Sequence, residues 1–269
     1  MLRALVISDD GYKSPGLWLV AKTLIDMGFK TIVATTLRPS SAMSHSITFN
    51  KELDLSIRRN QDLITVVVDG KPCDAFYAGL AVSDKGPDIV ISGINLGENT
   101  SIQNSLYSST VAVALEAGMI GFKSIAISVD AYRIEDFRNE WLRKILITVV
   151  RASTEWIIKY GMPNGVIAFN INVPLVKSYG TIPSVKVTKM AKRRFEQRAK
   201  ITNSKMRIVS NEMKLVPGTD SYEVKIQKNI TVVPLTLCID GISQCKPIDL
   251  ISTFNFANYI NSSLRELVK

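Results

Sequence analysis

The sequence predicts an α/β protein built on a mostly parallel β-sheet, and its first two-thirds support this prediction. Short apolar runs rich in β-branched residues alternate there with longer amphipathic segments. Most of the short runs are almost continuously apolar, as strands buried on both faces must be. A strand, a helix and a strand at this spacing form right-handed βαβ units, which place the strands in parallel. After about Pro174 the alternation stops, and we expect an appended antiparallel β arm followed by a C-terminal helix.

The elements of the first two-thirds follow one another in this alternating order. Strands are predicted over Leu2–Ser8, Thr31–Thr36, Leu63–Asp69, Asp88–Ser92, Ser124–Val129 and Val166–Ile171. The first helix begins at Pro15 and carries apolar residues on one face, at Leu17, Val20, Ala21 and Leu24. Further helices are predicted over Asp74–Val82, Ser109–Ile120 and about residues 136–159.

The last third lacks the alternation of strands and helices, and we do not expect it to form a core of its own. Strand-like pieces cover Ser184–Lys189, Ser221–Gln227 and Ile230–Pro234, and a helix with apolar residues that need a partner surface covers Pro247–Val268. We therefore expect an α/β core over residues 1–175 and an extended basic β arm for oligomerisation over 176–245. A C-terminal helix over 246–269 then docks on the core or on a partner subunit. A homodimer or homotetramer follows from this arrangement.

Composition excludes several classes of protein. With 46% apolar residues among 269, the chain can bury a full core, yet its longest apolar runs, such as Val111–Leu115, are too short to span a membrane. Asp9 and Asp10 come too early for a signal peptide, so we expect a cytoplasmic protein with no membrane partner. Neither an even disulfide framework nor a Cys-x-x-Cys clip is formed by Cys73, Cys238 and Cys245. We expect structural cysteines, with the last two paired only if the source is a hyperthermophile.

The net charge of +9 is concentrated in one segment. Residues Thr181–Ser210 contain nine basic side chains and one acidic one, Glu196, so the rest of the chain is close to neutral. A segment this basic is more often a solvated arm than a nucleic-acid surface, and it can also attract anionic substrates. Nucleic acid is therefore not the expected partner.

Two acids and a glycine follow the first predicted strand directly, as Ser8–Gly11. In open α/β sheets, ligands bind beyond the carboxyl ends of the strands. Adjacent carboxylates at this place can surround a divalent cation with oxygen ligands. The alternative is a turn with two solvated acids, since Asp-Gly is common in turns.

A serine-rich loop with the only histidine follows the second predicted strand, over Arg38–Ser46. One histidine excludes a multi-histidine zinc site. A Ser–His–Asp hydrolase would depend on His45 alone, because the chain has no Gly-x-Ser-x-Gly elbow. The loop is either a simple connection or a source of a hydroxyl ligand at the same sheet edge.

Two further polar segments follow the strand predicted at Asp88–Ser92. The stretch Ile91–Asn99 contains two asparagines and two glycines, and Tyr107–Thr110 opens a helix of small residues. Hydroxyls and unpaired N–H groups at a helix start suit an anion, whereas N-capping explains only one of the three hydroxyls. Neither a P-loop nor a Gly-x-Gly-x-x-Gly motif is present, so nucleoside triphosphatases and dinucleotide binding are not indicated. Together with the acids, this anion site indicates phosphate chemistry.

Several short motifs occur in a characteristic order along the chain. They are Asp9–Gly11, Ser41 with His45–Ser46, Gly70–Asp74, Ser92–Asn95, Tyr107–Val111, Asn170–Pro174 and Val233–Leu235. Their order and spacing resemble the survival protein E (SurE) phosphatases over roughly residues 1–235. The resemblance implies a divalent-metal 5′/3′-nucleotidase with a three-layer, Rossmann-like core and an extended oligomerising arm.

The resemblance also implies roles for individual residues. The implied metal ligands are Asp9, Asp10, Ser41 and Asn95. The implied phosphate-binding residues are Gly93, Asn99, Ser108, Ser109 and Thr110. The implied catalytic residues are Asp9, Asp10, Asn99 and Ser108. Oxygen ligands alone favour Mg²⁺ or Mn²⁺ over zinc, with one ion per subunit, and the expected substrate is a nucleoside monophosphate.

The sequence departs from the family pattern at a few positions. Ser8 stands where the family usually has asparagine, Ala42 where it has glycine, and Cys73 where it has alanine. Ser109 replaces a usual glycine and adds a side chain where phosphate should approach. This substitution bears on substrate range or rate more than on the class of reaction.

The expected mechanism is metal-assisted hydrolysis of a phosphate monoester by direct attack of water. An aspartyl-phosphate intermediate is less favoured, because metal ligation would occupy the same carboxylates. Three alternatives remain open: a nucleic-acid-binding module using the basic segment 186–207, a serine hydrolase built on His45, and a broad-range acid phosphatase or exopolyphosphatase. The first two leave the acid pair and the Ser108–Thr110 hydroxyls unexplained.

Overall fold

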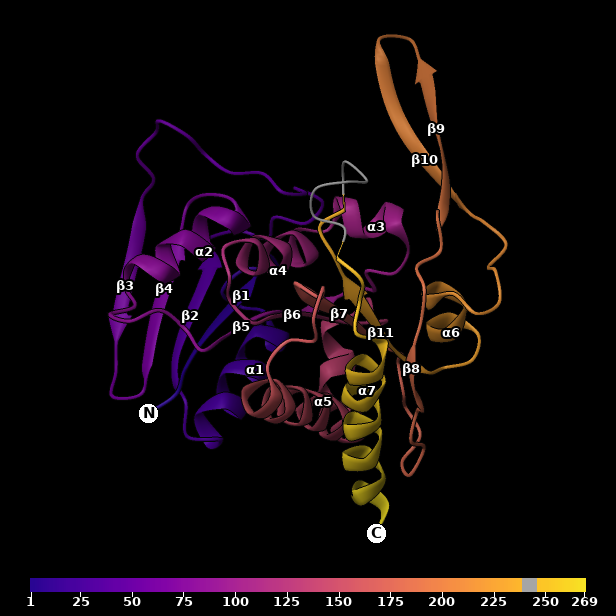
Figure 1. The fold of residues 1–269 in the computed structure, drawn as a ribbon. Helices are drawn as coiled ribbons and strands as arrows, with labels where there is room; N and C mark the ends of the chain where they lie inside the picture. Colours follow the sequence, from indigo (N-terminus) through magenta and orange to yellow (C-terminus); the bar gives the residue numbers. More distant parts are fainter. Residues whose placement is uncertain (239–245) are drawn as a thin grey trace.

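The computed structural model describes residues 1–238 and 246–269, and a nine-stranded, mostly parallel sheet forms its centre (Figure 1). The strand order is β3-β4-β2-β1-β5-β6-β7-β11-β8. The strands cover β1 Arg3–Ser8, β2 Lys30–Thr36, β3 Leu55–Arg59, β4 Leu63–Val68, β5 Ile89–Leu96, β6 Ser124–Val129, β7 Ala168–Val173, β8 Val185–Val187 and β11 Ile230–Leu235. Neighbours from β4 to β7 pair in parallel, whereas β3 and β11 run antiparallel to β4 and β7. The carboxyl ends of β1, β2, β5, β6 and β7 therefore share one edge.

Helices cover both faces of this sheet, which confirms the predicted α/β architecture (Figure 1). On one face lie α1 Pro15–Asp26, α5 Glu140–Tyr160 and α7 Leu250–Arg265, whose apolar residues join the largest cluster of the core. On the other face lie α2 Pro72–Ala81 and α4 Ser109–Met119, which pack against β1, β2 and β5. Two short helices, α3 Ser101–Tyr107 and α6 Asp220–Lys225, complete the fold.

Local sequence explains where the main helices begin. The Ser14 hydroxyl accepts a bond from Leu17 N at the start of α1, and Pro15 fills the first helical position, where no N–H is needed. Gly16 lets α1 approach the sheet, since a Cβ there would lie 2.0 Å from Ile94 O. The segment predicted as one helix over 136–159 is divided by Asn139, which ends the 3₁₀ turn η1 (Ile134–Arg138) and caps α5.

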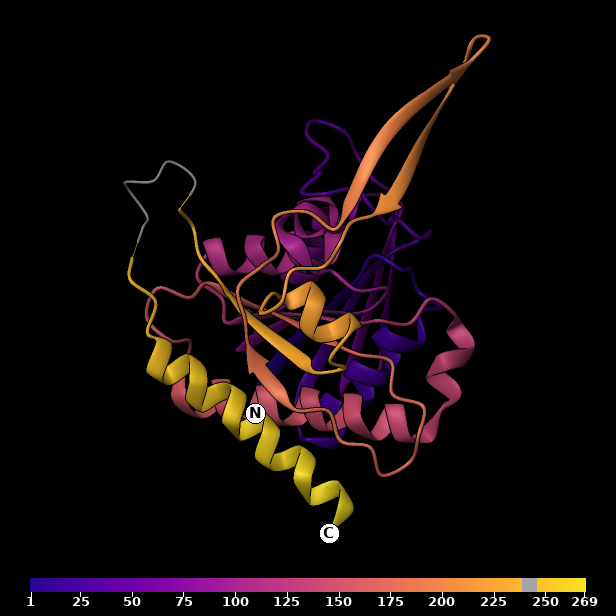
Figure 2. The ribbon, with the colours of Figure 1, turned by 90° about the vertical axis from the view of Figure 1, so that its right-hand side faces the viewer.

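The chain after β7 contributes both to the sheet and to a projecting hairpin. The predicted strands Ser184–Lys189 and Ile230–Pro234 are confirmed as β8 and β11, which extend the central sheet. Between them, β9 Phe195–Thr202 and β10 Lys205–Glu212 form a two-stranded hairpin that extends away from the rest of the molecule (Figures 1 and 2).

The strand predicted over Ser221–Gln227 is wrong, because most of this segment forms α6. Asp220 begins the helix in a fully buried position, where its carboxylate accepts bonds from the backbone N–H groups of Ser101, Ala191 and Ser221. These bonds reach across the fold and favour a helix start with an acidic first turn over the strand that the local alternation suggested.

The C-terminal helix α7 docks on its own chain. Phe256 stacks on Phe169 of β7 with ring centroids 4.3 Å apart, and α7 also packs against α5. Leu250, Ile251 and Phe254 on its first turns remain exposed. No helix in the described ranges is long and apolar enough to cross a membrane. Cys73 is a buried free thiol, whereas the pairing considered for Cys238 and Cys245 involves residue 245, which lies outside the described residues.

Candidate active site

Asp9 lies at the carboxyl end of β1 and is almost completely buried, with 3% of its surface exposed. The Thr110 hydroxyl donates a 2.7 Å hydrogen bond to Asp9 Oδ1. The Asp9 carbonyl accepts a 2.7 Å bond from Ser40 N, in the loop that follows β2. The two bonds connect three predicted site segments: the end of β1, the serine-rich loop and the start of α4.

Asp10 places a second carboxylate beside the first. Leu96 N, at the end of β5, donates a 3.0 Å bond to Asp10 Oδ2. Burial, followed by the neighbouring charge of Asp10, raises the pKa of Asp9 to about 7, against the opposing effect of the Thr110 bond. Burial also raises the pKa of Asp10, while the bond from Leu96 N opposes this change.

This acid pair fits a divalent cation. Each carboxylate keeps one oxygen, Asp9 Oδ2 and Asp10 Oδ1, without a hydrogen-bond donor in the described parts of the chain. Neither acid has a basic side chain within 4.0 Å among those residues. A buried and a partly buried carboxylate side by side without a counter-ion are costly, and a bound dication would remove both the repulsion and the raised pKa values.

Asn95 offers a third oxygen near the end of β5. The register between β5 and β6 shifts between Gly93 and Asn95, and such irregularities re-aim side chains. Asn95 Nδ2 donates a 2.7 Å bond to Gly97 O, which leaves Asn95 Oδ1 free of donors in the described structure. Gly93 has φ of 124°, and a Cβ there would lie 2.2 Å from Ile127 O, so this position requires glycine.

Ser41 lies in an exposed turn of the loop after β2, and its hydroxyl has no partner within the described ranges. The loop is nevertheless fixed to the helices beside the acids. Ser44 N donates to Tyr107 O at 3.0 Å, and the Ser44 hydroxyl donates to Leu106 O at 2.6 Å. His45 Nε2 lies 2.7 Å from a Glu116 carboxylate oxygen, farther along α4. His45 therefore holds this loop against α4, and no serine in the described residues hydrogen-bonds to its ring.

Asn99 is held more firmly than any other predicted site residue. Its N–H donates to Asn172 Oδ1 at 2.7 Å, and its carbonyl accepts from Asn170 Nδ2 at 2.9 Å. Its side-chain Nδ2 donates to the Ser128 hydroxyl at 2.9 Å. Because Asn170 and Asn172 lie on one face of the buried strand β7, they fix both the backbone and the orientation of Asn99.

The hydroxyls of Ser108, Ser109 and Thr110 are all buried at the first turn of α4, and each bonds within the protein. Ser108 Oγ accepts from Val111 N at 3.1 Å as the helix cap, and Ser109 Oγ donates to Ser40 O at 3.2 Å. The N–H groups of Ser109 and Thr110 have no partner in the part of the chain that the structure describes. An anion at this helix start would therefore meet free backbone donors.

A buried ion pair beside the site was not predicted. Arg194, at the base of the β9–β10 hairpin, is 2% exposed, and its Nε lies 3.5 Å from Glu98 Oε1. Its Nη2 donates to Glu212 Oε1 at 2.8 Å. This arginine therefore does not belong to the solvated basic surface expected for its segment. Its position within a run of basic residues gives no sign of burial.

Comparisons with known proteins all lead to one family. A family model described as "Survival protein SurE" matches residues 4–197. A protein named 5′-nucleotidase SurE from Pyrobaculum arsenaticum is 32% identical, over 98% of this chain and 100% of that protein. A protein of the same name from Hyperthermus butylicus is 32% identical, over 88% of this chain and 86% of that protein. The crystal structure of the SurE protein from Aquifex aeolicus matches with a TM-score of 0.73 at 29% identity, over 89% of this chain and 98% of that chain.

Proposed function

This chain belongs to the survival protein SurE family, and from this premise we propose that it hydrolyses nucleoside 5′- and 3′-monophosphates with the help of a divalent cation. One observation carries the proposal: the neighbouring carboxylates of Asp9 and Asp10 each keep one unbonded oxygen, and the Thr110 hydroxyl joins Asp9 to the helix start of α4. A dication beside a helix N-terminus is an arrangement suited to a phosphoryl group.

Four oxygens would hold the cation in this proposal. They belong to the side chains of Asp9, Asp10, Ser41 and Asn95. An all-oxygen set favours Mg²⁺ or Mn²⁺, one per subunit. Once bound, the cation would polarise a phosphoryl oxygen and lower the pKa of a bound water.

The protein's own groups would position the substrate and stabilise the negative charge on its phosphoryl oxygens. The free N–H groups at the start of α4 would donate to the phosphoryl oxygens, where negative charge grows during the reaction. Asn99, fixed through its backbone, would present its side chain to the same group, and Ser108 would keep the helix start in place as its cap. An ionised Asp9 or Asp10 would orient the attacking water. Direct attack is favoured because both carboxylates are engaged as ligands.

The alternative functions receive no support from these contacts. His45 bonds to Glu116 and lies in a serine-rich loop without bonding to a serine, so a serine hydrolase is not favoured. The segment proposed for nucleic acid includes Arg194, which is buried and paired with Glu98.

Phosphate release from a panel of nucleoside monophosphates tests the proposal. We expect release with Mg²⁺ or Mn²⁺ and none after chelation by EDTA, with activity restored when the metal is returned. Ribonucleotide and deoxyribonucleotide 5′- and 3′-monophosphates should all be compared with a simple aryl phosphate. Activity that persists fully in EDTA would contradict the proposal, as would hydrolysis of carboxylic esters instead.

The hairpin supports a second part of the proposal, a homodimer or homotetramer. Ile201, Met206 and Ile208 are each more than half exposed on the β9–β10 hairpin, which extends away from the rest of the described chain (Figure 2). A second copy of the chain is the proposed cover for these residues. Light scattering should show at least a dimer at micromolar concentration, and replacement of residues 196–211 by a short turn should yield monomers. A monomeric full-length chain would contradict this part.

A further inference from the structure

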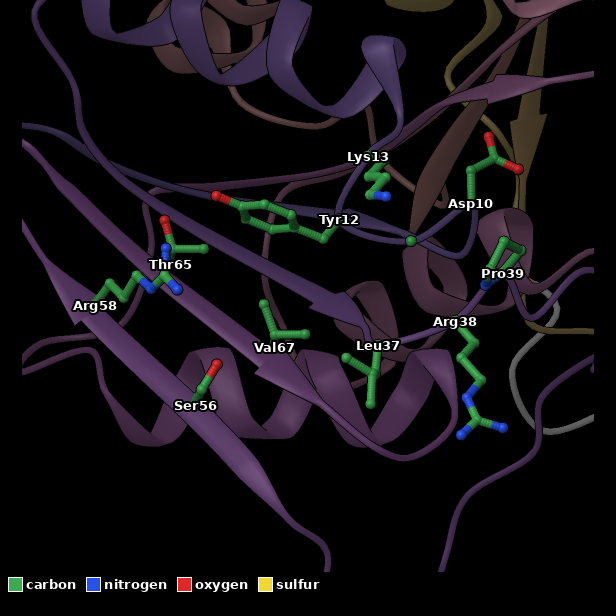
Figure 3. Close-up of a pocket in the computed structure, with 11 residues that line it drawn as sticks. Asp10, Tyr12, Lys13, Leu37, Arg38, Pro39, Ser56, Arg58, Thr65 and Val67 are labelled. Carbon is green, nitrogen blue, oxygen red and sulfur yellow. The ribbon is translucent and has the colours of Figure 1, made fainter.

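A cavity lies beside the turn formed by Asp10 and Gly11 (Figure 3). It encloses about 460 Å³, within the usual range for small-molecule sites. Of the residues assigned above to the metal and phosphate, only Asp10 lines it. In Figure 3 the Asp10 carboxylate points away from the other lining side chains. The cavity is therefore distinct from the candidate active site, although the two share a wall.

Cationic side chains from three different segments line this cavity. Lys13 comes from the loop before α1, Arg38 from the loop after β2, and Arg58 from the edge strand β3. None of them has a carboxylate within 4.0 Å in the described residues, and none of their side chains forms a hydrogen bond there. Three uncompensated cations around one cavity create a positive potential that favours an anionic ligand.

The middle of the cavity is apolar. Leu37 and Val67 line it beside the ring of Tyr12, whose hydroxyl end points toward Thr65 (Figure 3). Trp18 holds this ring edge-on, with centroids 5.2 Å apart, and also donates from Nε1 to Tyr12 O at 2.7 Å. The ring is thus fixed in place, yet Tyr12 remains 37% exposed. A fixed, accessible aromatic ring suits a planar ligand group.

We propose that this cavity binds a nucleotide, separately from the phosphate site at the start of α4. The base would lie against Tyr12, and the phosphates would pair with Lys13 and Arg58, since the Arg38 guanidinium is directed away from both in Figure 3. An inorganic anion would leave the apolar middle unused, and an uncharged nucleoside would leave the cations unpaired. The combination therefore favours a ligand that carries both a ring and a charge. This inference goes beyond the proposed hydrolysis and does not require it.

Binding can be measured in EDTA with the full-length Asp9→Asn variant, so that turnover does not consume the ligand. Tryptophan fluorescence reports occupancy, because Trp18 contacts Tyr12. The probes are AMP, ADP, adenosine and pyrophosphate. We expect AMP and ADP to bind at least about tenfold more tightly than the other two, with affinity that falls as salt rises. Equal binding of pyrophosphate and AMP would overturn the proposal, because it would indicate an anion site only.

Single substitutions then test which side chains of the cavity contact the ligand. Arg58→Ala and Tyr12→Leu should each weaken AMP binding about tenfold. Arg59→Ala is the matched control, since Arg59 lies next to Arg58 on the exposed strand β3 but does not line the cavity. Isothermal titration repeats the measurement independently of fluorescence. Unchanged AMP affinity in both Arg58→Ala and Tyr12→Leu would overturn the proposal. Failure of the wild-type chain to hydrolyse nucleotides would instead overturn the proposed function and leave these binding results standing.

Discussion

Thr110 and Asp9 lie 101 residues apart in the sequence, and a 2.7 Å hydrogen bond from Thr110 Oγ1 to Asp9 Oδ1 joins them. Both side chains are buried. The bond favours the charged form of the Asp9 carboxylate, whereas burial disfavours it. It therefore fixes the distance between the acid pair and the first turn of α4, the two parts that the proposed chemistry requires together.

Replacing Asp9 tests the functional claim most directly. Asp9→Asn keeps the shape of the side chain but removes one negative charge from the proposed cation site. We expect phosphate release with Mg²⁺ or Mn²⁺ to fall about a thousandfold, a loss of about 4 kcal/mol in transition-state stabilisation. In EDTA its melting temperature should equal or exceed that of the wild type, because repulsion by Asp10 is removed. Near wild-type turnover by the folded variant would rule out the metal-phosphatase proposal.

Ser109→Gly restores the residue usual in the family pattern. Ser109 Oγ bonds to Ser40 O at 3.2 Å, so its side chain is directed to the neighbouring loop. We expect kcat to stay unchanged or to rise, since the free N–H groups of the helix start remain. The free energy of unfolding should fall by about 1 kcal/mol, through the lost bond and the added chain entropy. Ser109→Ala, which loses only the bond, separates these two effects. A tenfold loss of kcat in both variants would show that the hydroxyl itself takes part.

Replacing only one partner of the buried Arg194–Glu98 ion pair should lower the free energy of unfolding. Arg194→Met removes one of the two cations near the buried Glu98 carboxylate and leaves only Lys225, so we expect a loss of about 3 kcal/mol in urea unfolding. Adding Glu98→Gln should recover part of this loss, as a double-mutant cycle would reveal. Arg198→Met, in the same hairpin but exposed, should change stability by less than about 0.5 kcal/mol. Additive effects in the cycle would mean that the two charges do not interact.

The Cys73 thiol should resist alkylation. Burial, with contributions from Glu116 and Asp74, raises its pKa to about 12, above its ordinary value of 9.0. Less of the reactive thiolate is therefore present at any pH below 12, and iodoacetamide labelling at pH 8 should be at least about a hundredfold slower than in the unfolded chain. The rate should still rise between pH 9 and pH 11, where a free thiol levels off. Mass spectrometry of the peptide that contains residue 73 measures this, and rapid labelling of the native protein would contradict it.

Asn172 should affect both stability and kcat, although it is not one of the proposed metal or phosphate ligands. Asn172→Ala leaves the buried N–H of Asn99 without an acceptor, which costs about 1–3 kcal/mol of stability. Because Asn99 then loses its fixed position, kcat should fall as well. Ser153→Ala is the control, since the Ser153 hydroxyl is equally buried but has no hydrogen-bond partner in the described chain. Equal effects of the two substitutions on kcat would contradict the positioning role of Asn172.

The strands and helices that bury apolar surface were predictable because their patterns are local. β1, β2 and β6 are almost wholly buried, and their central residues form short apolar runs. The strand β3 was missed because all its residues are exposed and only the antiparallel pairing with β4 defines it. The helix α6 was read as a strand because its start depends on bonds to residues about thirty and more than a hundred positions away.

The candidate site was predictable only where its residues follow a strand or begin a helix. Asp9, Asn95 and Ser108 could be placed at the carboxyl edge in this way. Roles at the metal and the phosphate came from the family resemblance and remain proposals. Asn170 and Asn172 carried a usable signal, since two asparagines at alternate positions of an apolar strand must share a buried face. Arg194 carried none, because a buried arginine differs from its exposed neighbours only through a partner distant in sequence.

The position of β11 between β7 and β8 has a consequence for how the sheet closes during synthesis. In chain order, β8 and the β9–β10 hairpin are synthesised after β7 and before β11, although β11 is the strand that pairs with β7. Until residue 235 is available, β7 is an edge strand made of fully buried residues, with open N–H and C=O groups on one side. Such an edge is a template for pairing with another chain. Fragments that end before β11 should therefore aggregate through β7, even though every residue of the candidate active site is already present in them.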